Sequence, residues 1–162
     1  MNSKGYIWQI VVIIFSMIYP FLCILLAGLN HSLSSYWSTS AEPIFIFSNI
    51  MVAYFFYQTQ HWKIPAIFLI LLTSFNNILY PDIHYVFAIL FFITSFIALF
   101  NSKRYVWIKI IYVIGSVLMI KSLLLGEIIC IMAIGLYHTL ILNKLHNLTN
   151  IKNLNQNKNG ER

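Results

Sequence analysis

The chain has 162 residues, of which 60 % are hydrophobic and only 9 % are charged, and its formal net charge is +6 at pH 7. A soluble domain carries about 25 % charged residues to cover its surface, so this composition excludes one and indicates a membrane protein. The basic residues flank apolar runs and do not alternate with aromatic residues on one face, which excludes a nucleic-acid-binding protein and makes membrane lipid the partner of the positive charge.

Six apolar runs follow one another along the chain, and each is read as a membrane-spanning helix. The predicted spans are residues 6–29, 42–60, 64–80, 83–100, 105–124 and 127–143. A helix needs about 20 apolar residues to cross a bilayer, whereas barrel strands would be about 10 residues long and would alternate with polar residues. The first run is too long for the apolar part of a signal peptide. The sequence therefore predicts an all-α integral membrane protein, a bundle of six transmembrane helices.

Polar connections separate these runs, and a polar tail follows them. Pro43 suits the first turn of the second span, where its missing N–H is harmless. Residues 81–82 (Pro-Asp), residues 101–104 (Asn-Ser-Lys-Arg) and Gly126 mark the next turns. Residues 1–145 form one predicted transmembrane domain. Residues 146–162 are Asn-rich and predict a disordered cytoplasmic tail, because they hold too little apolar surface to order themselves.

The distribution of Lys and Arg predicts the orientation. If the spans alternate in direction, nine of the ten basic residues share the side of both chain ends, and Lys121 alone lies opposite. Positive charge stays cytoplasmic, so both termini are predicted to be cytoplasmic. The Ile-, Asn- and Lys-rich composition is typical of AT-rich bacterial genomes and favours a multi-pass protein of a bacterial cytoplasmic (inner) membrane.

Polar residues are concentrated in the predicted outer half of the bundle. Such groups at depth normally face the bundle interior or a watery cavity, so they predict an outward-facing polar pocket between helices. The candidate ligand-binding residues are Ser34, Tyr36, Glu42, Asn49, Asn77, Asp82 and His84.

Plainer interpretations compete with this pocket. Asn77 and its neighbour Asn76 are also expected to bridge helices by hydrogen bonds, and Asp82 to cap the fourth helix. Lys121 and Glu127 are expected to form an ion pair across the last outer turn. His138, inside the sixth span, is either a functional ionisable group or part of a hydrogen bond between helices.

Metal and cofactor sites have weak support in the sequence. Asp82 and His84, with His31, Glu42 or Glu127, could supply zinc ligands, but no HExxH motif occurs. No Gly-x-Ser-x-Gly motif and no Gly-rich phosphate loop is present, so we expect no metal and no cofactor. Cys23 and Cys130 lie in apolar runs and are expected to be buried free thiols, with a disulfide between them as the alternative.

Two stretches resemble a known family. Residues 32–39 (SLSSYWST) resemble a Ser-x-Ser-x-Tyr-Tyr-x-Thr string, and residues 84–92 (HYVFAILFF) a His-x-x-x-Ala-x-x-Phe-Phe element, of small bacterial membrane proteins in domain-of-unknown-function family 998. The resemblance covers about residues 30–125, with Trp37 in place of a second Tyr and Pro43 in place of an acid. It implies a six-helix bundle with both motifs near the outer face, and no settled activity.

The leading functional hypothesis is a non-enzymatic membrane protein that binds or moves a small amphipathic or lipid-like molecule through the outward-facing pocket. A metal-assisted lipid hydrolase or transferase at the outer leaflet is one alternative. A structural subunit that joins a membrane-protein partner is the other.

Overall fold

The computed structural model describes the backbone of residues 3–160 and the side chains of residues 5–59, 61–149 and 151. All regular elements in this part of the chain are helices, so the all-α fold class is confirmed, and each predicted run forms one α-helix. They are α1 (Ser3–Ala27), α2 (Glu42–Gln58), α3 (Lys63–Ser74), α4 (Pro81–Asn101), α5 (Val106–Leu118) and α6 (Leu123–Gly160), with the 3-10 helices η1 (Leu33–Ser38) and η2 (Gln60–Trp62).

Within the described part of the chain, three helices are long and apolar enough to cross a membrane. They are Gly5–Ala27 within α1, Pro81–Asn101, and Leu123–Thr149 within α6. The apolar helices α3 and α5 are shorter; at 1.5 Å per residue they measure about 18 and 20 Å, against about 30 Å for the hydrocarbon core. The outside of the bundle is apolar: Ile89, Ile93 and Ile97 on α4 are each more than half exposed. Such a surface suits lipid better than water.

Two helices end earlier than the sequence predicted. α3 stops at Ser74 and not at residue 80, because the side-chain Oδ1 of Asn76 accepts a hydrogen bond from the Ile78 N–H at 2.7 Å and holds a turn. α5 stops at Leu118 and not at residue 124, where the N–H groups of Lys121 and Ser122 turn back to the Leu118 carbonyl at 3.0 and 2.8 Å. Local bonds of this kind set helix ends within an apolar run.

The sixth helix is longer than predicted. Residues 146–160 belong to α6 in place of a disordered tail, and residues 161–162 lie outside the described part. An apolar residue recurs every third position at Leu142, Leu145, Leu148 and Ile151. The Tyr6 ring also stacks on His146 with 4.1 Å between ring centroids, and its hydroxyl donates to Asn143 Oδ1 at 2.5 Å. The contact with α1 at Asn143 and His146 thus accounts for the start of this extension, where composition alone favoured disorder.

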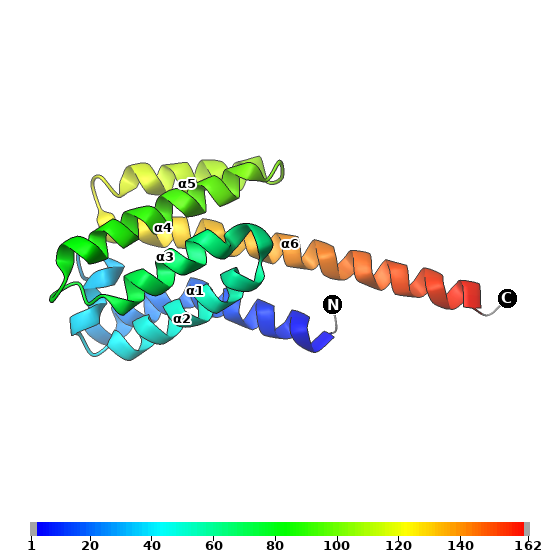
Figure 1. Cartoon of the computed structure of the whole chain (residues 1–162), viewed down its shortest axis with the longest axis horizontal. Coiled ribbons are helices and arrows are strands. Elements are labelled where there is room, and N and C mark those ends of the chain that lie inside the picture. Colours follow the sequence, from blue (N-terminus) through cyan, green and yellow to red (C-terminus); the bar gives the residue numbers. More distant parts are fainter. Residues whose placement is uncertain (1–2, 161–162) are drawn as a thin grey trace.

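The six α-helices pack around one another in a ring, in which one pair of neighbours, α4 and α5, is in weaker contact than the others. α1, α2, α3 and α4 pack in succession, and α6 packs on both α1 and α5. Figure 1 shows these helices side by side, with the second half of α6 extending beyond the bundle. α4 and α5 contact each other only sparsely. The boundary between α4 and α5 is therefore the place where a side opening can form.

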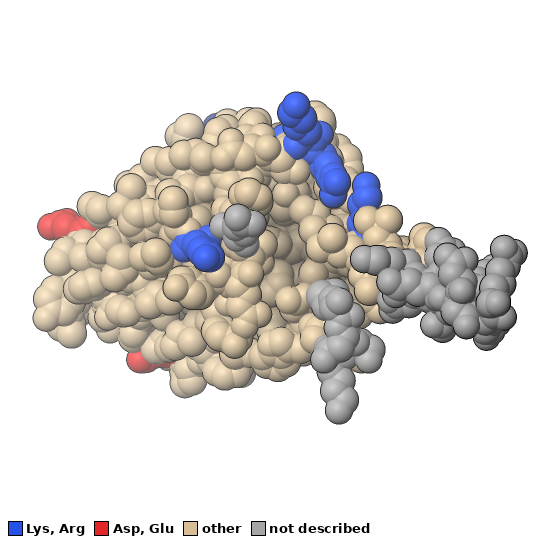
Figure 2. All heavy atoms as spheres, turned by 45° about the vertical axis from the view of Figure 1, so that its right-hand side comes forward, with Lys and Arg blue, Asp and Glu red and all other residues tan. Residues whose placement is uncertain are grey.

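The two ends of the bundle carry opposite charges. Glu42 and Asp82 lie in the first turns of α2 and α4, at what we call the acidic end. Lys63 begins α3, and Lys103 and Arg104 lie between α4 and α5, at the basic end. Figure 2 shows the acidic atoms toward one end of the molecule and most of the basic atoms toward the other.

Candidate functional site

The first connection, residues 28–41, folds back over the acidic end of the bundle. Gly28 ends α1 with a φ of +76°, a conformation that glycine adopts without strain, and its carbonyl accepts a hydrogen bond from the Tyr36 hydroxyl at 2.7 Å. The Leu124 N–H donates to the His31 carbonyl at 3.1 Å, which ties the connection to α6. Burial raises the pKa of the Tyr36 phenol, which therefore stays protonated and able to donate.

Glu127 anchors this connection from the side of α6. Its side chain is only 5 % exposed, and its Oε2 accepts a hydrogen bond from the Leu33 N–H at 2.7 Å. This is the one hydrogen bond that the Glu127 side chain makes with the described residues, so the other carboxyl oxygen is left for another partner. Burying a carboxyl group among apolar helices costs free energy unless it is hydrogen-bonded or paired, and such buried groups commonly have a functional role.

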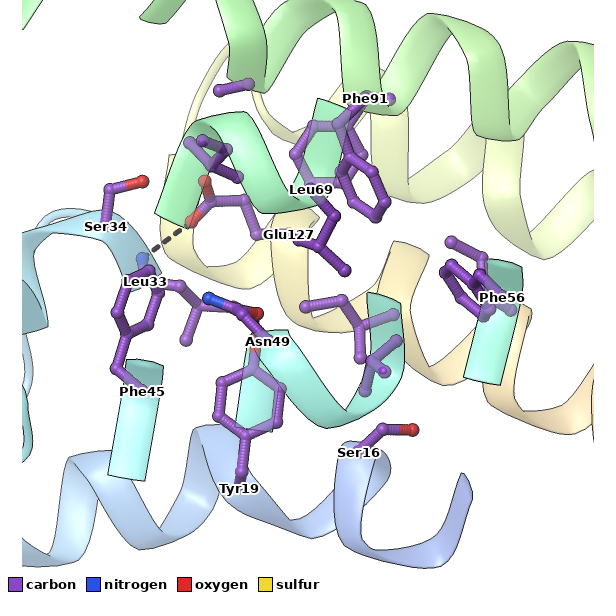
Figure 3. Close-up of a pocket in the computed structure, with 16 residues that line it drawn as sticks. Ser16, Tyr19, Leu33, Ser34, Phe45, Asn49, Phe56, Leu69, Phe91 and Glu127 are labelled. Atoms are coloured by element: carbon purple, nitrogen blue, oxygen red, sulfur yellow. Dashed lines mark hydrogen bonds between the residues drawn. The ribbon is translucent and has the colours of Figure 1, made fainter. Parts of the chain in front are cut away.

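A narrow chamber lies beneath the first connection, and Figure 3 shows its lining. Its walls are apolar except for a few polar side chains that enter from different elements. Tyr19 on α1 and Asn49 on α2 meet there, with 3.5 Å between the Tyr19 hydroxyl and Asn49 Oδ1. The cavity volume is about 50 Å³, which is room for a few water molecules. The polar lining residues are Ser16, Tyr19, Ser34, Asn49 and Glu127.

A wider groove lies next to this chamber, between α4, α5 and α6. Its cavity volume is about 550 Å³, within the usual range for small-molecule sites. Its α4 wall runs from Tyr85 to Phe96, about 16 Å along the helix axis. Ser34 and Glu127 line both the groove and the chamber. The groove thus pairs a long apolar wall with a polar end at the acidic end of the bundle.

The structure brings together only part of the predicted pocket. Ser34 and Asn49 line the chamber, but the other five candidates line neither the chamber nor the groove. Tyr36 is buried within the first connection, and Glu42 is half-buried at the start of α2. Tyr36 and Glu42 lie at the same end of the bundle as the chamber but point away from it, because the position of a residue along a helix axis does not determine which way its side chain points.

The last three candidates lie around the turn between α3 and α4. Asn77 is half-buried in this turn and Asp82 is exposed, without the helix-capping bond expected of it. His84 is fully buried, and its Nδ1 lies 2.7 Å from the Phe75 carbonyl. This histidine ties the turn to α4, which is a structural role.

The structure also bears on the predicted ion pair, the two cysteines and the suggested zinc ligands. The ion pair between Lys121 and Glu127 is wrong, since Lys121 is exposed while the Glu127 carboxylate is buried against Leu33. Cys23 and Cys130 are buried free thiols, as predicted. The suggested zinc ligands do not converge: in the described part of the chain, no three His, Cys, Asp or Glu side chains are grouped so that they could hold a metal ion.

Sequence reasoning missed three residues of the site. Ser16 was read as a break in the first apolar span and Tyr19 as part of that span. Glu127 was read as the ion-pair partner of Lys121 at the last outer turn, or as one of the zinc ligands considered there. A signal for Glu127 existed in its spacing, because Ile131 and Ile134 follow at i+4 and i+7 and share its face of α6. An acidic residue at the start of an apolar stripe that faces inward is expected to point into the bundle interior as well.

Comparisons of this chain with protein-family models, with curated proteins and with solved structures found no match. The resemblance to family 998 therefore stays a prediction.

Proposed function

We propose that the chain spans a bacterial cytoplasmic membrane six times, with the basic end in the cytoplasm. The separation of charges between the two ends supports this orientation. The shorter helices α3 and α5 would cross with the help of their flanking turns and local thinning of the bilayer. The acidic end, with the first connection and the groove's polar end, then faces the outer leaflet.

Cysteine labelling tests this orientation. The native Cys23 and Cys130 are fully buried and give a low background. We expect Asp82→Cys to react with a membrane-impermeant maleimide on intact cells, and Lys103→Cys to react only after permeabilisation. Labelling of both positions from the same compartment would contradict the proposed topology.

Within this topology, we propose that the protein binds a small amphipathic molecule in the groove, with its apolar chain along α4 and α5 and its polar head at Ser34 and Glu127. The observation that carries this proposal is the position of a buried carboxyl group at the inner wall of an apolar groove. One carboxyl oxygen is free of the Leu33 N–H, and Ser34 adds a hydroxyl. A head group that donates hydrogen bonds, such as an amine or a hydroxyl, complements these oxygens.

The sparse contact between α4 and α5 supports a route into the groove. A lipid-like molecule in the outer leaflet could enter sideways between these helices and keep its chain in an apolar environment. The geometry supports binding equally for a carrier and for a receptor, and both share this first step.

Filling the groove tests the proposal. Ser116 lines the groove from α5 and is half-buried, so the Ser116→Phe variant should weaken binding of a dansyl-labelled long-chain amine by roughly tenfold through steric overlap. Fluorescence titration in an uncharged detergent gives the affinity.

Ile114→Phe is the matched control, because Ile114 lies on the same helix, is 51 % exposed and does not line the groove. Equal affinities of the two variants, or saturable binding of the corresponding carboxylate as tight as that of the amine, would overturn the proposal.

A further inference from the structure

A third cavity lies at the basic end of the bundle, and it shares no residue with the chamber or the groove. Its volume is about 290 Å³. The turn between α2 and α3, the end of α4 with the turn that follows it, and the middle of α6 enclose it. The polar side chains that line it are Thr59, His61, Asn101, Ser102, Arg104, Tyr137 and His138.

His138 lines this cavity and is 97 % buried, with only 3 % of its side chain exposed. Aromatic rings surround it, with ring centroids 4.5 Å away for Trp62 and 5.1 Å for both Phe55 and Phe56. Its Nε2 has no hydrogen-bond partner among the described residues. A buried ring nitrogen without a partner is costly, and here it belongs to a side chain that lines a cavity with room for a ligand group.

The mouth of the cavity is cationic and rich in hydrogen-bond donors. Arg104 and His61 are exposed there, and Asn101 adds an amide. No carboxylate lines the cavity, and the described acids, Glu42, Asp82 and Glu127, belong to the opposite end. An anionic oxygen group would meet only favourable charges at this mouth, whereas a cation would meet none.

The turn that carries Arg104 is held in place. Lys109 donates from its Nζ to the Ser102 carbonyl and, at 3.3 Å, to the Phe100 carbonyl. The Arg104 N–H donates to the Ser102 hydroxyl at 3.2 Å. These bonds fix the backbone of the turn, which places the base of the Arg104 side chain beside the cavity and lowers the entropy lost when a ligand binds.

We propose that this basic-end cavity is a binding site for a phosphate group, with Arg104 at its mouth and His138 at its floor. The volume fits a phosphate head group and not a whole lipid, whose chains would lie outside along the helices. The phosphate can come from a lipid head group or from free phosphate. This site is independent of the groove and of the proposed function.

Native mass spectrometry of the full chain in uncharged detergent tests the site with phosphatidic acid, and with diacylglycerol as the phosphate-free control lipid. We expect one saturable phosphatidic acid per chain and about tenfold weaker binding in Arg104→Gln, since a charge-assisted contact is lost. Lys103→Gln removes the same charge from an exposed neighbour that does not line the cavity, and we expect less than a twofold change.

His138→Phe tests the floor of the cavity, since Phe fits the aromatic surroundings but lacks a ring nitrogen. We expect roughly fivefold weaker binding. A second arm measures the shift of the thermal unfolding midpoint with inorganic phosphate against chloride at equal ionic strength. Saturable binding of phosphatidic acid, with no effect of inorganic phosphate on the unfolding midpoint, identifies a lipid head group as the ligand. A shift of the midpoint with inorganic phosphate that Arg104→Gln abolishes identifies free phosphate. Equal losses in Arg104→Gln and Lys103→Gln, or no saturable binding in either arm, would overturn the proposal.

Discussion

We expect the Glu127→Gln variant to bind a long-chain amine about 10- to 100-fold more weakly than the native protein, because a charge-assisted hydrogen bond becomes a neutral one. Gln keeps the shape of the side chain and an oxygen that can accept from the Leu33 N–H, whose present bond to Oε2 is 2.7 Å long. The first connection should therefore remain in place. The loss should fall on the amine and much less on an alcohol of equal chain length.

Glu42→Gln provides the control for this comparison. Glu42 lies at the same end of the bundle and carries the same charge, but it lines neither the chamber nor the groove. We expect it to bind the amine like the native protein, with the thermal unfolding midpoint recorded for each variant. If both variants bound the amine equally weakly, the general negative potential of the acidic end would be what attracts the amine. The specific contact with the Glu127 carboxyl group would then not contribute.

The sequence revealed the helices well because each one is apolar over most of its length. In lipid the outer face of a helix is as apolar as its inner face, so whole runs stand out. The ends were less predictable. α3 ends six residues early because Asn76 forms a side-chain turn inside an apolar run. α6 continues past the predicted end, where it contacts Tyr6 on α1, and a contact that depends on tertiary packing is not visible in the sequence.

The site was harder to predict than the fold, since the sequence gives depth but not direction. Asp82 and His84 are two positions apart, about 200° around a helix at 3.6 residues per turn. They therefore point to opposite sides, and one is exposed while the other is buried. Asn49 lines the chamber because a polar residue in the middle of an apolar run faces inward. Glu127 was misread because Lys121 offered a nearby opposite charge across the turn.

The close packing between α5 and α6 leads to the second large effect, on stability. A Cβ at Gly126 would lie 2.5 Å from the Met119 nitrogen and 2.6 Å from the Gly115 carbonyl oxygen, both of which are backbone atoms. The turn would have to open to admit it. We expect Gly126→Ala to lower the free energy of unfolding by about 3 kcal/mol. Equilibrium unfolding in mixtures of dodecyl sulfate and dodecyl maltoside measures the change.

Gly135→Ala is the matched control on the same helix. Its Cβ would meet Met17 side-chain atoms at 2.5 and 2.7 Å, and a methionine side chain can move aside. Ala also favours the helix over Gly by about 1 kcal/mol, so we expect Gly135→Ala to change stability by less than about 1 kcal/mol. Because Gly126 directly precedes Glu127 in α6, opening the turn between α5 and α6 should also move the carboxyl group away from Leu33 and weaken amine binding. If Gly126→Ala proved as stable as Gly135→Ala, the close contact between Gly126 and the backbone of α5, which helps to place Glu127 at the groove, would be contradicted.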